Sequence, residues 1–360
     1  MGSSQVSSIP EGFISGTSIA ALTCTDADSG TNGNCALSIQ SGDDGSAKFT
    51  ISGTTLQTTA TATDYEALSS QNYIYSLVVI ATDTATAGSD LTGTAYVYVT
   101  ITGTNDNTPV ISGTTPSSIS VAENSAVGTT VASVQASDAD DGNDGVLTYS
   151  IIGGNSEARF GIGTTTGEIY LTLALDYETT TSYSLTVQAT DGGSPTDSAT
   201  SAVTVTVTDV NDNTPACPSS TYIYSVAETV SSGTTVTTLA CTDADGDSMT
   251  YTITSGNSEG CFSLTGAVLT TSCVLDYDTG SQSYTLAMDV SDGTTSSSVT
   301  VYVSLSAAND NNPAFASNPT VSLAESTSVG TAVTTYTAAD ADLSPHEVVS
   351  YVITAGTRKL

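Results

Sequence analysis

The stretch Asp209-Val210-Asn211-Asp212-Asn213-Thr214-Pro215 decides how this chain is organised. Near copies lie at 103–109 (GTNDNTP) and 307–313 (AANDNNP), so the stretch recurs about every 100 residues. Short oxygen-bearing side chains closed by a proline cannot continue a buried strand, because proline has no N–H for the sheet. The same oxygens are the ligands that hard cations prefer. The stretch therefore predicts a junction between domains that is built to hold cations.

Between the junctions, apolar residues alternate with Ser and Thr, as in strands with one buried face. The segments 183–189 (YSLTVQA) and 202–208 (AVTVTVT) alternate strictly, and helical periodicity is absent from every period. In the second period we expect strands at 119–123, 129–136, 146–152, 159–162, 168–171, 183–189 and 202–208. Seven short antiparallel strands in about 100 residues predict a β-sandwich. The predicted fold class is all-β, with tandem seven-stranded Greek-key sandwiches of the immunoglobulin-like kind.

The recurrence divides the chain into four predicted repeats. They cover 1–106 (first strand incomplete), 107–212, 213–310 and a partial repeat at 311–360. The last repeat reaches its third strand near Tyr351 and then ends, so we do not expect it to close a core by itself.

Charge narrows the choice of partners. Four Lys and Arg residues against 37 Asp and Glu give a net charge of −33. Such a surface repels phosphate backbones and anionic lipid headgroups, which argues against nucleic acid and membrane surfaces as partners. A merely salt-adapted, soluble surface is the plainer reading. The carboxylates, however, cluster at repeating places instead of spreading over exposed faces.

The six cysteines, at 24, 35, 217, 241, 261 and 273, lack zinc or redox spacing and predict disulfides in an oxidising compartment. Cys217 with Cys241 and Cys261 with Cys273 are plausible cross-strand pairs, and Cys24 and Cys35 bracket an acidic loop. Six cysteines allow 15 pairings, so the connectivity stays open. The sequence shows neither a signal peptide nor a run of about 20 apolar residues. We therefore expect a piece of a longer extracellular or cell-surface protein, whose parent is single-pass transmembrane.

Acidic elements recur at fixed places in each period. A glutamate follows the first strand: Glu11, Glu123, Glu228 and Glu325. Asp-Ala-Asp follows the second: Asp26/Asp28, Asp138/Asp140, Asp243/Asp245 and Asp340/Asp342. An Asp-Tyr-acid group precedes the sixth: Asp64/Glu66, Asp176/Glu178 and Asp276/Asp278. An aspartate follows the sixth: Asp83, Asp191 and Asp292.

Strand direction sorts these elements into two ends of a sandwich. The glutamate and the Asp-Tyr-acid group share the end from which the junction leaves, and the other two lie at the opposite end. At the middle junction, head-to-tail stacking would gather Glu123, Asp176, Glu178, Asp209 and Asp212 with Asp243, Asp245 and Asp292. So many carboxylates cannot crowd together uncompensated. About three divalent cations would balance most of the charge, and oxygen-only ligation selects Ca²⁺.

These motifs, in this order and repeated, resemble tandem cadherin repeats of the protocadherin-like or long atypical kind. The matching residues in the second repeat are Ala122-Glu123-Asn124, Asp138-Ala-Asp140, Leu175-Asp176-Tyr-Glu178, Ala189-Thr-Asp191 and Asp209-Val-Asn-Asp-Asn213. The resemblance implies about three Ca²⁺ at each complete junction. It implies ligation through the side chain of Asn211 and through the backbone carbonyls of Val210 and Asn213. The corresponding junction residues are Asn105, Asp106 and Asn107, then Asn309, Asp310 and Asn311.

Three departures weaken the outer junctions. Gly103 and Ala307 stand where the middle junction has Asp209, so each outer junction should bind one ion more weakly. Asp278 replaces the usual glutamate and reaches less far. The partial fourth repeat supplies no aspartate after a sixth strand, and Asp26, Asp28 and Asp83 form a half-site with no repeat above it.

Two other kinds of site fit the motifs poorly. An EF-hand loop starting at Asp243 would need a glutamate at Thr254, with helices on both sides. Paired carboxylates such as Asp64/Glu66 could serve acid–base catalysis, but they recur at every junction, and the lone His346 leaves no Ser-His-Asp triad. We therefore expect no enzyme.

The resemblance implies Ca²⁺-dependent adhesion by a rigid extracellular rod, with cadherin repeats of the same or a related protein as partners. The absence of Trp excludes adhesion by exchange of an N-terminal Trp within this chain. The alternative is a Ca²⁺-stiffened spacer or matrix protein without adhesive contacts.

Overall fold

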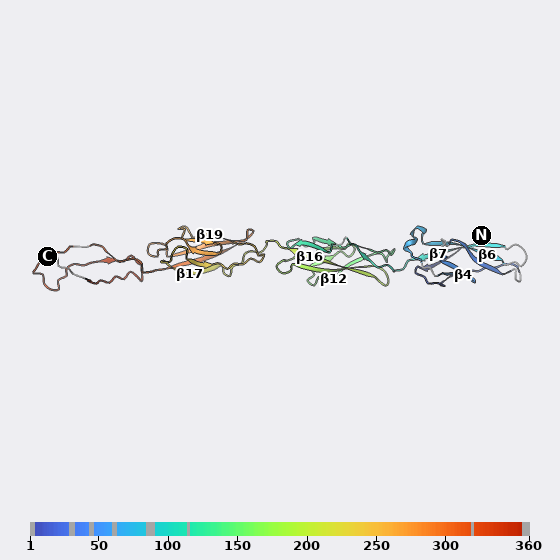
Figure 1. Ribbon diagram of the computed structural model, residues 1–360, viewed down its shortest axis with the longest axis horizontal. Coiled ribbons are helices and arrows are strands. Elements are labelled where there is room, and N and C mark those ends of the chain that lie inside the picture. The colour runs from blue at the N-terminus through green and yellow to red at the C-terminus, as the bar shows by residue number, and fades with distance from the viewer. Residues whose placement is uncertain are drawn as a thin grey trace. The chain divides into compact units, whose positions relative to one another are not determined.

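A computed structural model describes residues 4–28, 33–42, 47–59, 63–83, 91–113, 116–317 and 320–354. The chain divides into two compact units, 1–208 and 209–360. Repeat one (β1 to β7) and repeat two (β8 to β16) belong to the first unit, and repeat three (β17 to β23) belongs to the second. Each repeat uses its own stretch of chain, as the colours in Figure 1 show.

Each of these repeats has a four-stranded sheet facing a three-stranded sheet, which confirms the predicted all-β sandwich class. In repeat one the order is β1 (Ser4–Pro10), β7 (Thr92–Thr102), β6 (Ile74–Asp83), β3 (Cys35–Ser41), and its second sheet is β2 (Ser18–Ala21), β5 (Thr55–Thr58), β4 (Phe49–Ser52). In repeat two the order is β9 (Ser118–Ala122), β16 (Ser198–Thr208), β15 (Ser182–Thr190), β12 (Thr148–Gly153), and its second sheet is β10 (Thr130–Ser133), β14 (Glu168–Leu171), β13 (Phe160–Ile162). In repeat three the order is β17 (Thr221–Ala227), β23 (Ser296–Ser306), β22 (Ser283–Ser291), β19 (Thr250–Ser255), and its second sheet is β18 (Thr235–Thr238), β21 (Val268–Thr271), β20 (Phe262–Thr265).

The first strand of each repeat pairs in parallel with the last, whereas we expected antiparallel strands throughout. With seven strands of alternating direction, the first and the last run the same way, so they must pair in parallel when they lie side by side. The chain consequently enters each sandwich at one end and leaves at the other. This topology puts the end of the first strand beside the departing junction.

Several boundaries differ from the expected ones. The predicted strand 129–136 divides into β10 and the two-residue β11 (Ala136–Ser137), which pairs with β8 (Val110–Ile111). The last strand of repeat two begins at Ser198, four positions before the alternating pattern. Repeat one also has a 3₁₀ helix, η2 (Glu66–Gln71), which is too short to show as helical periodicity in the sequence.

Three separate hydrophobic cores are built to one plan. In each, a phenylalanine packs edge-on against a tyrosine of the sixth strand, as in Phe160–Tyr183 with ring centroids 5.1 Å apart. The equivalent pairs are Phe49–Tyr75 at 5.1 Å and Phe262–Tyr284 at 4.9 Å. The alternating strands supply the remaining contacts, with Leu185 and Val203 fully buried. Such burial contributes roughly 1.5–3 kcal/mol for each large side chain.

The prediction of disulfides is confirmed, and the connectivity that the sequence left open is Cys24–Cys35, Cys217–Cys241 and Cys261–Cys273. The described part of the fourth repeat behaves differently from the others. It forms only β24 (Ala314–Phe315) and β25 (Ala338–Ala339), and residues such as Val329 and Ile353 are almost fully exposed. No helix in the described part of the chain is long and apolar enough to cross a membrane.

Candidate metal centres at the repeat junctions

A buried glutamate organises the lower end of each sandwich. Glu11, Glu123 and Glu228 are 5%, 4% and 2% exposed. One carboxylate oxygen of Glu11 accepts the backbone N–H of Tyr65 at 2.6 Å, and the other accepts that of Thr104 at 2.8 Å. This glutamate therefore ties the Asp-Tyr-acid loop to the departing junction.

The same contact recurs in the other repeats. The N–H of Tyr177 donates to Glu123 at 2.6 Å, and the N–H groups of Tyr277 and Ala308 donate to Glu228. A carboxylate oxygen has two lone pairs, so each glutamate keeps acceptor capacity for a cation.

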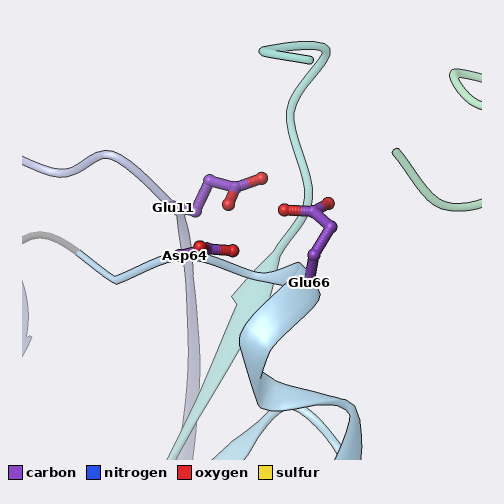
Figure 2. A group of neighbouring side chains, drawn as sticks. All are labelled: Glu11, Asp64 and Glu66. Carbon is purple, nitrogen blue, oxygen red and sulfur yellow. The ribbon is translucent and has the colours of Figure 1, made fainter. Parts of the chain in front are cut away.

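The first junction gathers carboxylates from three segments. Carboxylate oxygens of Glu11, Asp64 and Glu66 lie within 4.8 Å of one another. Figure 2 shows Glu11, after β1, and Glu66, at the start of η2, directing their carboxylates toward each other with Asp64 beside them. A second group, Glu66, Asp106 and Asp140, meets the same 4.8 Å limit, so Glu66 is shared by both groups.

Glu66 carries the clearest mark of uncompensated charge. Its Oε1 is buried and has no hydrogen-bond partner. Desolvation raises the pKa of Glu66 to about 7, and the nearby charges of Glu11 and Asp106 add to the effect. Desolvation and the charges of Glu11, Asp140 and Asp64 also raise the pKa of Asp106. The chain's basic residues, Lys48, Arg159, Arg358 and Lys359, all lie outside the junction motifs.

The Asp-Ala-Asp loops share one turn. The N–H of the second aspartate donates to the first, as from Asp140 to Asp138 at 3.0 Å. The same bond links Asp28 to Asp26, Asp245 to Asp243 and Asp342 to Asp340. The turn satisfies one oxygen of the first aspartate and leaves the other available: Oδ2 of Asp138 and of Asp243 is buried without a partner.

The last asparagine of each junction clamps the second aspartate of the following loop. Asn107 donates both its backbone N–H (3.2 Å) and its side-chain amide (2.9 Å) to Asp140. Asn213 binds Asp245 in the same way at 2.9 and 2.6 Å, and Asn311 binds Asp342 at 3.0 and 2.9 Å. The clamp fixes the junction to the top of the next sandwich. It needs a side chain that can donate a hydrogen bond, which explains why this position holds an asparagine and not another oxygen ligand.

Asn105 is held by the aspartate that follows the sixth strand. Its amide group donates to Asp191 at 3.2 Å and to the carbonyl of Pro195 at 2.7 Å. Its own oxygen, Oδ1, is buried without a partner. A Cβ on Gly193 would lie 2.2 Å from the Asn105 side chain, so glycine makes room for it. Gly193 is a site residue that the motif search missed, although it follows Asp191 closely in the sequence.

The aspartates after the sixth strand also cap their own loops. Asp191, 3% exposed, accepts N–H groups of Gly193 and Asp197. These bonds and that from Asn105 lower the pKa of Asp191, although desolvation opposes them. Asp292 accepts the N–H groups of Thr294 and Thr295, and Thr295 also donates to the carbonyl of Asn213 at 3.4 Å. Asp83 accepts the N–H of Leu91 at 2.9 Å.

The third junction repeats the lower half of the first. Glu228, Asp276 and Asp278 form a group within 4.8 Å. Asp278 reaches across to the side chain of Asn311 at 3.0 Å and to the N–H of Leu343 at 2.7 Å. Desolvation, together with the charges of Glu228, Asp278, Asp342 and Asp276, raises the pKa of Asp310. Asn309 is exposed.

The residues predicted for the middle junction fall in both compact units. Glu123, Asp138, Asp140, Asp176, Glu178 and Asp191 belong to residues 1–208, and Asp209, Val210, Asn211, Asp212, Asn213, Asp243, Asp245 and Asp292 belong to residues 209–360. Within the second unit, Oδ1 of Asn211 and Oδ2 of Asp243 are buried without partners, matching Asn105 and Asp138. The complete middle site stays a prediction.

Comparison with known proteins settles the family. The cadherin domain matches residues 5–102, 117–208 and 222–306. The chain belongs to the cadherin family. Cadherin ectodomains lie outside the cell and serve adhesion rather than catalysis.

The curated relatives are much longer proteins than this chain. Human protocadherin Fat 4 is 34% identical over 288 residues, which is 78% of this chain and 6% of Fat 4. The protocadherin-like wing polarity protein stan of Drosophila melanogaster is 34% identical over 375 residues, 98% of this chain and 10% of stan. This cadherin chain thus spans about a tenth or less of these relatives.

Two solved structures are similar. The EC22-24 fragment of mouse cadherin-23 superposes with a TM-score of 0.70 at 26% identity, covering 84% of this chain and 95% of that one. The cis-dimer structure of protocadherin gammaB7 EC3-6 gives a TM-score of 0.75 at 26% identity, covering 94% of this chain and 83% of that one.

Ca²⁺ fits the donor set of the first junction. The clustered ligand atoms are all carboxylate oxygens, and buried oxygens of Glu66, Asn105 and Asp138 have no donor of their own. A buried acceptor without a partner costs roughly 1–3 kcal/mol. Hard cations accept six to eight oxygens each and so satisfy acceptors of this kind, whereas Zn²⁺ prefers His or Cys ligands, which these groups lack.

Proposed function

We propose that this cadherin chain is a Ca²⁺-dependent adhesive segment whose repeats are locked together by ions at the junctions. The observation that carries the proposal is the set of buried, unpartnered oxygens at Glu66, Asn105 and Asp138 in the first junction. The repeats are proposed to span 1–106, 107–212, 213–310 and 311–360, with about three ions at a complete junction.

The proposed ligands have separable roles. Glu11, Asp64, Glu66, Asp106 and Asp140 would hold ions on the side of repeat one. Asn105, Asp138 and Asp191 would hold an ion at the top of repeat two. The third junction would use Glu228, Asp276, Asp278 and Asp310, with Asp340 and Asp342 beyond it.

The residues themselves explain why the joint depends on ions. Without compensation, desolvation together with the like charges nearby, from Glu11 for both groups and from Asp140 for Asp106, raises the pKa values of Glu66 and Asp106. Bound Ca²⁺ supplies positive charge and oxygen coordination shared between adjacent repeats. Extracellular Ca²⁺ is near millimolar, so sites with dissociation constants of about 10⁻⁴–10⁻³ M are partly to largely filled. Mass action then adds roughly 0.4–1.4 kcal/mol of stability for each site.

The test is thermal unfolding of the whole chain in Ca²⁺, Mg²⁺ and chelator, with bound Ca²⁺ counted by equilibrium dialysis. We expect the melting temperature to rise with Ca²⁺ more than with Mg²⁺, because Mg²⁺ sheds its water reluctantly. A matched control is Glu168→Gln, which removes an exposed carboxylate that belongs to none of the junction motifs. Equal melting temperatures in Ca²⁺ and chelator, with no Ca²⁺ retained on dialysis, would refute the proposal.

Adhesion is tested separately from ion binding. Beads coated with the chain should aggregate in Ca²⁺ and disperse in chelator, because the contact needs the ordered segment and copies of the same or related cadherin repeats. The dimer form of the protocadherin gammaB7 structure supports contacts between such repeats. Ca²⁺-stabilised chains that never aggregate beads would favour the spacer function instead.

A further inference from the structure

The first junction carries contacts between repeats one and two that involve no metal ligand set. Tyr65, the centre of the Asp-Tyr-acid group, stacks on Tyr73 with ring centroids 4.1 Å apart and planes 14° apart. The hydroxyl of Tyr73 then donates to Oδ2 of Asp141 in repeat two at 2.9 Å. We propose that Tyr65, Tyr73 and Asp141 form a latch that holds the first junction closed without a cation. The latch needs no cation and so goes beyond the proposed ion-dependent joint. The other junctions lack its residues.

An insertion in repeat one creates the latch. The connection from Asp64 to Tyr75 is longer than the equivalent connections from Asp176 to Tyr183 and from Asp276 to Tyr284. The extra residues form η2, and Asn72, directly after its last residue, takes the left-handed conformation with φ of 54°. Tyr73 follows with φ of 59°. Two successive left-handed residues reverse the chain sharply, and Tyr73 stacks on Tyr65.

Gly103 leaves room for the ring of Tyr65. A Cβ at Gly103 would lie 3.2 Å from Cδ1 and 3.3 Å from Cε1 of Tyr65. That approach is tighter than ordinary van der Waals contact, so a side chain at 103 would require the ring to shift by a few tenths of an ångström. The middle junction has Asp209 at this position. The first junction therefore has an aromatic stack where the middle junction has an acidic side chain.

The other junctions lack the partners of the latch. Counting back from the core tyrosine of the sixth strand, Thr181 and Gln282 stand where repeat one has Tyr73. Counting on from Asp-Ala-Asp, Gly246 and Leu343 stand where repeat two has Asp141. The tyrosine, the aspartate and the small residue at 103 thus occur together only at the first junction. At the first junction these residues offset the absence of an aspartate at position 103, where the middle junction has Asp209.

The latch also differs from the ion site in its physics. Stacked rings attract each other beyond what burial alone contributes, and this attraction does not depend on divalent ions. The hydroxyl donates to a charged acceptor, which makes this the stronger class of hydrogen bond. The contact is solvent-exposed, so its contribution stays modest. Loss of the hydrogen bond between Tyr73 and Asp141 should lower the ratio of closed to open first junctions about three- to tenfold.

The experiment measures distance distributions across each junction of the full chain. Spin labels on genetically encoded residues at Ser76, Ser184 and Thr285 occupy equivalent, exposed positions of the sixth strand and leave the disulfides intact. In chelator, double electron–electron resonance should give a narrower distribution for 76–184 than for 184–285. Tyr73→Phe keeps the ring but removes the hydroxyl, and it should broaden 76–184 alone, as should Asp141→Ala, which removes the acceptor. Thr181→Ala, at the equivalent position of repeat two, is the matched control and should change neither distribution.

A second variant separates the latch from ion binding. Gly103→Asp should broaden 76–184 in chelator, because it displaces Tyr65, yet narrow it in Ca²⁺ by restoring the aspartate of the middle junction. A narrow 76–184 distribution that persists in both Tyr73→Phe and Gly103→Asp in chelator would overturn the latch. A 76–184 distribution as broad as 184–285 in the unmodified chain would do the same. Failure of Ca²⁺ to narrow 184–285 would instead count against the proposed ion-dependent function and leave the latch standing.

Discussion

Glu11 and Glu66 lie in one cluster, but removing their charges should have opposite effects in the absence of Ca²⁺. Glu11 is 5% exposed and accepts two backbone N–H groups, from Tyr65 and Thr104. Glu66 offers a buried oxygen that accepts none. Glu11→Gln keeps the shape of the side chain but replaces one acceptor oxygen with a donor. One of the two N–H groups then loses its partner.

The size of the effect follows from these contacts. A hydrogen bond to a charged group is worth about 1.5–3 kcal/mol, so Glu11→Gln should lower the local opening free energy by about that amount. This corresponds to exchange roughly 10- to 150-fold faster at the amides of Tyr65 and Thr104. Glu66→Gln breaks none of these bonds and removes a repelling charge, so the same amides should exchange at the original rate or more slowly.

Hydrogen exchange of the full chain in chelator measures both variants. Amides in the core of repeat three, such as that of Leu286, provide an internal control, because they lie in the other compact unit. In Ca²⁺ both variants should lose protection relative to the unmodified chain, since both remove a proposed ligand. Two outcomes would refute this reasoning: unchanged exchange at Tyr65 and Thr104 in Glu11→Gln, or equal acceleration in Glu66→Gln.

Three further expectations concern pH, the unequal junctions and the packing of the junction asparagine. Because the pKa of Glu66 is raised from 4.5 to about 7, its contribution to folding is fully present below its ordinary pKa and is lost as pH rises through about 7. In chelator the first repeat should therefore melt higher at pH 6 than at pH 8, whereas Ca²⁺ affinity should be lower at pH 6 than at pH 8, because protons compete with Ca²⁺ for the Glu66 carboxylate. Asp212→Ala should broaden the distance distribution across the middle junction more than Asp106→Ala broadens the first, where Gly103 has already removed an acidic residue; equal broadening would contradict this. Gly193→Ala should weaken Ca²⁺ binding several-fold in calorimetry, because its Cβ would lie 2.2 Å from the junction asparagine, whereas Gly113→Ala, with no atom within 4 Å, should bind as before.

The sequence predicted the parts of the fold that depend on periodicity. The alternation around Leu185 and Val203 predicted the buried face of the sixth and seventh strands, and the structure buries both residues completely. It did not predict the parallel pairing of β1 with β7, because alternation reports which face is buried and says nothing about which neighbour lies alongside. The short helix η2 left no periodic trace either, since six residues span too few turns.

The acidic motifs predicted which residues gather at the junctions, but they did not predict the contacts that hold these residues in place. The structure brings Glu11, Asp64 and Glu66 together as their order along the chain indicated. The sequence does not predict the clamp from Asn107 to Asp140, because an asparagine in a ligand motif indicates only an oxygen that can bind a cation. The sequence does not predict the stack of Tyr65 on Tyr73 either. The stack depends on a left-handed turn at Asn72 and Tyr73, and these residue types do not by themselves indicate that turn.

The proposed ion-dependent rigidity is tested most directly by small-angle X-ray scattering of the full chain with 1–2 mM Ca²⁺, about the extracellular level, and with chelator. We expect a longer maximum dimension and a larger radius of gyration in Ca²⁺, because shared ligands stop the repeats from folding back on one another. Asp209→Ala should reduce this difference by loosening the middle junction. Identical scattering curves in Ca²⁺ and in chelator would refute ion-dependent rigidity.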